Sequence, residues 1–174
     1  NTYSCYSRIV DEVALAKRFT VIKEFSEQSA PIPDGTSFPI SIGNCTANRS
    51  ANPASIAPSY PADFDNGAAQ QVITILGANT AACTVSETLP SATAPKGCTW
   101  RAPNYSTDNG ATWSTTPPSV TGVNATQLPI GQRLPAVRIR NHLDCEAVTE
   151  PPVVNMTKTC LPNPLIITAP GPQE

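Results

Sequence analysis

The chain has 174 residues, of which only 14% are charged and 19 are proline, and its formal net charge is −2. The charged fraction lies well below the roughly 25% of an average soluble domain, and the absence of a basic cluster argues against a nucleic-acid partner. No apolar run is long enough to span a bilayer, so membrane insertion is not expected.

The residue pattern along the chain predicts a series of short strands. Runs in which apolar and polar residues alternate are typical of half-buried strands, and Pro, Gly and Asn mark the turns between them. The run 8–17 fits either a short helix or a strand. The predicted strands are Phe19–Phe25, Ser37–Cys45, Gln71–Leu76, Ala82–Leu89, Val120–Leu128 and Leu134–Leu143.

Turns and loops are predicted between these strands. Residues 31–35 and 90–97 have the composition of turns, and residues 46–69 that of a long surface loop without periodicity. The segment 100–113 contains Asn109-Gly110, a strong hairpin signal. Short strands with frequent turn signals indicate an all-β, immunoglobulin-like sandwich.

Three parts are expected along the chain: an N-terminal extension at 1–16, a β-sandwich domain at 17–145 and a Pro-rich C-terminal extension at 146–174. The C-terminal extension contains two strand-like runs, 153–160 and 165–168. Both runs are too short to bury themselves. They are expected either to pack on the sandwich or to pair with another molecule.

The cysteines predict disulfide bonds in an oxidising, extracellular environment. Their number is even, none forms a C-x-x-C pair, and the chain has a single histidine, so zinc or haem ligation is not expected. Short separations favour Cys83–Cys98 and Cys145–Cys160, one arrangement among the 15 that six cysteines allow. The six are Cys5, Cys45, Cys83, Cys98, Cys145 and Cys160.

Sequons for N-linked glycosylation point to the same environment. An Asn-x-Ser/Thr sequence marks a candidate attachment site on an exposed surface. About two such sequences are expected by chance in a chain so rich in Asn, Ser and Thr, and the excess favours an extracellular location with attached glycans. The sequons begin at Asn44, Asn48, Asn104, Asn124 and Asn155.

Three predicted strands each place one polar residue in line with apolar ones. Because side chains alternate between the two faces of a strand, Lys23 shares a face with Phe19, Val21 and Phe25. By the same rule Glu87 follows Cys83 and Val85, and Asn141 follows Val137 and Ile139.

A reaction among these three residues can remove the cost of burying them. A lone buried charge costs several kcal/mol. A desolvated lysine becomes a neutral nucleophile, and a buried glutamate can carry a proton. Lys23, Glu87 and Asn141 are therefore candidates for an autocatalytic isopeptide bond between the first and last strands. The alternative is that Lys23 extends to solvent, Glu87 ends its strand and Asn141 begins a turn.

The same residues carry a family resemblance over about 17–143. The stretches Phe19-Thr20-Val21-Ile22-Lys23, Gly35-Thr36-Ser37-Phe38, Glu87-Thr88-Leu89-Pro90 and Val137-Arg138-Ile139-Arg140-Asn141 resemble a prealbumin-like surface-protein domain, the B-type repeat of collagen adhesins and Gram-positive pilins. The resemblance implies a prealbumin-like sandwich in which Lys23, Glu87 and Asn141 form the intramolecular isopeptide. One departure is Cys98, which stands where the family has an aromatic residue.

Other polar residues give weaker signals. His142 is expected at the surface, facing away from the core, and Asp63 and Asp65 lack the spacing of a calcium loop. Trp100, Tyr105 and Trp113 fit core or cross-strand positions better than a ligand platform. We therefore expect no enzyme activity on other molecules, no metal and no cofactor.

These observations predict an extracellular structural subunit that assembles with copies of itself into a filament, pilus or surface layer, by strand addition between neighbours. The alternative is an adhesin or stalk module of a larger cell-surface protein that binds a host or matrix ligand.

Overall fold

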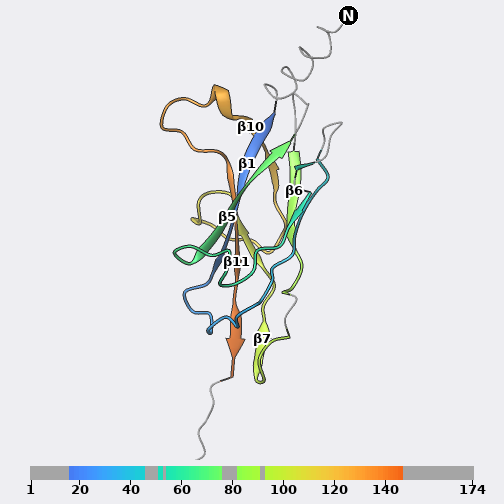
Figure 1. Cartoon of the computed structure of the whole chain (residues 1–174), viewed down its shortest axis with the longest axis vertical. Coiled ribbons are helices and arrows are strands. Elements are labelled where there is room, and N and C mark those ends of the chain that lie inside the picture. The colour runs from blue at the N-terminus through green and yellow to red at the C-terminus, as the bar shows by residue number, and fades with distance from the viewer. Residues whose placement is uncertain (1–15, 46–50, 53, 76–81, 91–92, 147–174) are drawn as a thin grey trace, which may run out of the picture.

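The structure is a computed structural model that describes residues 16–45, 51–52, 54–75, 82–90 and 93–146. These residues form strands and one short 3-10 helix at Ala125–Gln127. The prediction of an all-β fold is confirmed, and the presence of several sheets around one core is consistent with a β-sandwich (Figure 1). The predicted extensions, residues 1–15 and 147–174, lie outside the described residues.

The larger sheet is built around the first and last long strands. β1 (Lys17–Phe25) pairs in parallel with β11 (Ala136–Asn141) along one side and antiparallel with β5 (Ala68–Ile75) along the other. Because β1 and β11 run in the same direction, the described chain enters at one end of this sheet and leaves it at the other. The remaining strands of the sheet are β3 (Ala51–Asn52), β8 (Asn104–Ser106) and β10 (Val123–Asn124).

The second sheet has four strands in the order β4-β2-β6-β9. In it, β6 (Ala82–Glu87) lies between β2 (Ile40–Gly43) and β9 (Ser119–Thr121), and β4 (Ser55–Ile56) pairs with β2. A separate two-stranded ribbon joins β7 (Cys98–Trp100) to β12 (Leu143–Cys145), and it lies at the lower end of the molecule in Figure 1.

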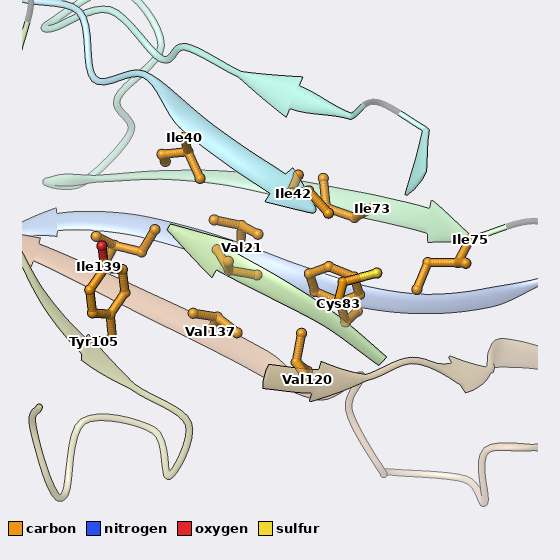
Figure 2. Close-up of a cluster of buried hydrophobic side chains, with 12 residues drawn as sticks. Val21, Ile40, Ile42, Ile73, Ile75, Cys83, Tyr105, Val120, Val137 and Ile139 are labelled. Atoms are coloured by element: carbon orange, nitrogen blue, oxygen red, sulfur yellow. The ribbon is translucent and has the colours of Figure 1, made fainter. Parts of the chain in front are cut away.

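One cluster of buried apolar side chains draws on both sheets (Figure 2). Burial alternates along the central strands, so each strand contributes every second side chain to the cluster. Burial of apolar surface at about 25 cal/mol per Å² is the main favourable term that holds such a fold together. The cluster comprises Phe19, Val21, Ile40, Ile42, Ile73, Ile75, Cys83, Val85, Tyr105, Val120, Val137 and Ile139.

Most predicted strands are present with shifted ends, but Val120–Leu128 is not one strand, because β9 and β10 fall in different sheets and the 3-10 helix follows. Two further predictions were wrong. The segment 46–69 is not one surface loop, because β3, β4 and the start of β5 fall within it. The segment 100–113 is not a hairpin, because β7 pairs with β12 and β8 pairs with β11. Asn109 and Gly110 do form a positive-φ turn, but a single bridge between Tyr105 and Ser114 closes it.

The predicted cysteine pairing is also wrong. The disulfides are Cys45–Cys83 and Cys98–Cys145. Cys83 belongs to β6, next to the β2 strand that Cys45 follows, and Cys98 is directly opposite Cys145 in the β7–β12 ribbon. Each bond therefore joins residues that strand pairing has already brought together, whereas the prediction used separation along the chain. Cys5 and Cys160 lie outside the described residues.

We expect peptide mapping of the unreduced protein to recover Cys45 linked to Cys83, and Cys98 linked to Cys145. Replacing Cys98 and Cys145 together by alanine should lower the free energy of unfolding by about 3–4 kcal/mol, because the bond closes a loop between residues 47 apart in sequence. The measurement is denaturant unfolding of both proteins under non-reducing conditions. A recovered peptide that links Cys83 to Cys98 would contradict the pairing.

Candidate functional site

The candidate site consists of three polar side chains inside the sandwich. Lys23 comes from β1, Asn141 from the end of β11 in the same sheet, and Glu87 from the end of β6 in the opposite sheet. Their exposed fractions are 1%, 0% and 7%. The alternation of faces in these strands therefore directs all three inward, and Lys23 does not extend to solvent.

The three side chains are in contact. The Lys23 ammonium donates a short hydrogen bond to Oδ1 of Asn141, and its Nζ lies 3.5 Å from Oε2 of Glu87. Parallel pairing makes the first contact possible, because Lys23 lies opposite Ile139 and Phe25 lies opposite Asn141. The amine and the carboxamide thus meet within one sheet, and the carboxyl group approaches them from the other.

Aromatic rings surround the amine of Lys23. Its Nζ lies 4.5 Å from the ring centroid of Phe38 and 5.2 Å from that of Phe25. Phe25 in turn stacks on Phe64 with the centroids 5.0 Å apart, and Phe38 meets Trp100 edge to face. Cation–π contact stabilises a charged amine by only about 1–2 kcal/mol, so this apolar wall mainly removes water from the site.

Burial shifts both titratable groups towards their neutral forms. It lowers the pKa of Lys23 to about 8, an effect that the nearby negative charge of Glu87 opposes. Burial likewise raises the pKa of Glu87, and here the positive charge of Lys23 opposes the shift. In both residues desolvation is the larger effect. Both shifts are therefore in the direction of the neutral amine and the neutral carboxyl group.

Several polar atoms of the site lack hydrogen-bond partners. Among the described residues, both carboxyl oxygens of Glu87 and Nδ2 of Asn141 are buried without one. Leaving a buried polar group unpaired costs about 1–3 kcal/mol. Native proteins contain few such groups, and each calls for a structural or chemical reason.

Tyr105 supports the site and was not assigned to it from the sequence. It lies on β8 opposite Ile139 of β11, and its hydroxyl oxygen accepts a hydrogen bond from the backbone N–H of Glu87 at 2.9 Å. Burial raises the pKa of this hydroxyl. The contact links the two sheets where the carboxyl group enters the core. Only the burial of a tyrosine in a short strand could have indicated it, because its partner lies 18 residues away.

This arrangement suits attack by the amine on the carboxamide. A neutral lysine is a nucleophile, and a protonated carboxyl group beside the carboxamide can polarise it and carry a proton to the leaving nitrogen. Holding the two reacting groups in contact also replaces an encounter in solution with an intramolecular step.

The other candidate residues take no part in the contact among Lys23, Asn141 and Glu87, although Trp100 borders the aromatic wall around the amine. The guanidinium carbon of Arg140 lies 3.9 Å from the ring centroid of Trp113. Trp100 packs on Phe38. His142 is partly exposed beyond the end of β11. Within the described ranges, no group of three or more His, Cys, Asp or Glu side chains is arranged to hold a metal ion, and no helix there is long and apolar enough to cross a membrane.

Three of the five sequon asparagines fall in the described residues. Asn44 is exposed after β2, and Asn104 and Asn124 are partly buried in β8 and β10. The Ser106 hydroxyl of the Asn104 sequon is buried and bonded to Asp108. Asn44 is therefore the most accessible of the three. Asn48 and Asn155 lie outside the described residues.

Comparison of the chain with known protein families, with curated protein sequences and with solved structures found no significant match.

Replacing Tyr105 by phenylalanine should lower the free energy of unfolding by about 1–3 kcal/mol, because the buried N–H of Glu87 loses its acceptor. Denaturant unfolding of the two proteins measures the difference. Replacing the partly exposed Tyr60 by phenylalanine is the matched control and should change stability by less than about 0.5 kcal/mol. Equal effects of the two substitutions would show that the Tyr105 contact contributes nothing.

Proposed function

We propose that this chain is an extracellular structural subunit whose strands β1 and β11 are joined by an isopeptide bond between Lys23 and Asn141. The observation that carries the proposal is the contact of three buried groups, the Lys23 amine, the Asn141 carboxamide and the Glu87 carboxyl. Left unreacted, they are a costly set to bury. Crosslinked, they become an amide beside a neutral acid, which removes the buried charge.

The proposed reaction conserves every atom. The Lys23 Nζ attacks Cγ of Asn141, the Nζ–Cγ bond forms, and the Cγ–Nδ2 bond breaks. Glu87 accepts a proton from the attacking nitrogen and delivers one to Nδ2, which leaves as ammonia. No oxidant, metal or cofactor is needed, and the protein itself is the only substrate of this reaction.

Strand direction gives this bond a mechanical role. β1 and β11 are parallel neighbours, so tension applied to the two ends of the described chain pulls them past one another. A covalent bond from residue 23 to residue 141 carries that tension directly and shields everything between. Such a module suits a filament, pilus or surface layer of the kind that the prealbumin-like resemblance implies.

A stalk module of a larger adhesin is the second candidate. The same parallel arrangement supports it, because domains joined end to end carry load in the same way. The two candidates differ in self-association. We expect purified protein seen by negative-stain microscopy to be filamentous, and monodisperse single particles at high concentration would favour the stalk.

The crosslink predicts a mass deficit. After reduction and removal of any glycans, the intact protein should be lighter than its sequence by one ammonia. The variants Lys23→Met, Asn141→Ala and Glu87→Gln should each show the full sequence mass, because they lack the nucleophile, the carboxamide or the proton carrier. The exposed variant Lys96→Met is the control and should keep the deficit. A full mass for the unmodified protein would sink the proposal.

The crosslink also predicts a large loss of stability in Asn141→Ala. The bond closes a loop between residues 118 apart in sequence, which in the chain-entropy treatment of crosslinks corresponds to about 4–5 kcal/mol. Denaturant unfolding with disulfides intact gives the value. A loss of about 1 kcal/mol or less would argue that no covalent bond existed to be removed.

A further inference from the structure

One edge of the larger sheet is incomplete. β5 pairs with β1 over its whole length, but on its other side β3 pairs only with Thr74 and Ile75. The chain then crosses to the other sheet, where the carbonyl of Ala54 accepts a hydrogen bond from Ile42. At the opposite end of β5, Ala68 is bonded to Asp65 in a tight turn. The stretch between these two contacts has no neighbouring strand in the part of the chain described.

The hydrogen bonds of β1 determine which backbone groups of β5 point outwards from the sheet. Thr20 N–H donates to Pro135 and Ser26 N–H donates to Asn141, so the even-numbered residues of β1 are bonded on the β11 side and the odd-numbered ones on the β5 side. Ladder pairing then turns Gln71 of β5 towards β1, while Gln70 and Val72 point their N–H and C=O groups outwards. These two residues offer a short edge for strand addition.

A cavity of about 400 Å³ lies next to this edge. It separates β5 from the segment that begins with β4 in the other sheet, and Val21 and Lys23 of β1 contribute to its wall. Gln71 occupies a core-facing position of β5, between the buried Ala69 and Ile73, and is nevertheless exposed. The side of the sandwich is therefore open here. The cavity is lined by Val21, Lys23, Ser55, Ile56, Ala57, Pro58, Asp63, Ala69, Gln70 and Gln71.

We propose that the open edge at Gln70–Val72 accepts residues 165–168 of a neighbouring copy as an added strand, with Leu165 and Ile167 inserted into the cavity. This inference rests on the proposed role as a self-assembling subunit and names the surface and the segment involved. The donor is Leu165-Ile166-Ile167-Thr168, one of the few β-branched runs of the chain outside the described residues.

Length and chemistry match the donor to the edge. Pro164 and Pro170 bracket the donor run, and because proline lacks an N–H it limits pairing to the few residues between them. The accepting edge is equally short. Alternation places Leu165 and Ile167 on one face, where they meet the apolar wall formed by Val21, Ile56 and Pro58.

Charge is consistent with the same pairing. The sequence from 159 to 173 contains no charged residue, so the donor brings no charge that burial would penalise. On the accepting side, the Asp63 carboxylate already accepts a hydrogen bond from the backbone of Ser59, and the proposed crosslink neutralises Lys23.

The test uses two variants of the full chain. Val72→Pro removes an outward-facing N–H and leaves the bonds between β5 and β1 in place, so it blocks the edge alone. Leu165→Asp together with Ile167→Asp disables the donor. The matched controls are Val72→Thr and the pair Asn163→Asp and Gln173→Glu, which add the same charge outside the donor run. Sedimentation velocity measures association.

The expected pattern is specific to strand exchange between copies. The unmodified chain and both controls should form multimers whose size grows with concentration, and each variant alone should remain monomeric. An equimolar mixture of the two variants should form a heterodimer, because one supplies an intact donor and the other an intact edge. A monomeric unmodified chain would overturn the inference, because the donor would then be unused or bound within its own chain.

Two further results would also overturn it. If Val72→Pro abolishes association but the donor variant still associates, two β5 strands pair edge to edge. If both variants still associate, the contact lies elsewhere on the molecule. In either case the proposed crosslink would stand, because it does not depend on how copies of the chain associate. Both variants should keep the ammonia deficit, which separates failure of strand exchange from failure of the crosslink.

Discussion

The burial of one lysine amine is the constraint on which the rest of this structure depends. Lys23 lies at the meeting point of two sheets, with a carboxamide beside it and a carboxyl group opposite. An isolated buried charge costs several kcal/mol, and aromatic rings rather than water surround this one. The fold retains the arrangement only if the groups compensate one another or react.

The strand topology brings the groups of the proposed reaction together. The strand that carries the amine and the strand that carries the carboxamide are the first and last long strands described, and they are parallel neighbours. Glu87 comes from the facing sheet, and Tyr105 holds its backbone in place. One disulfide joins β6 to the chain just after β2, and the other joins the two strands of the terminal ribbon. The proposed crosslink would therefore reinforce the β1–β11 pair, and the disulfides reinforce the β2–β6 pair and the terminal ribbon.

Much of this site could be predicted because strand alternation is a local property. Counting every second residue placed Lys23, Glu87 and Asn141 among apolar neighbours, and their burial agrees with that count. The wrong predictions were those that depend on which strands become neighbours. The cysteines pair across strand ladders rather than along the chain.

Pairing between strands distant in the sequence also explains the other wrong predictions. The turn at Asn109-Gly110 forms without a hairpin, because β8 before it pairs with β11 and β9 after it pairs with β6. The segment 46–69 lacks periodicity because its strands are only two residues long and change sheets. The sequence does not indicate the contact of Tyr105, because its partner is a backbone N–H of the other sheet.

The most direct test of the crosslink is to locate it. Digestion of the reduced, unfolded protein followed by tandem mass spectrometry should yield one branched peptide in which Lys23 is joined to Asn141, with the mass of the two linear peptides less one ammonia. Recovery of both linear peptides, with an intact lysine and an intact asparagine and no branched species, would contradict the account.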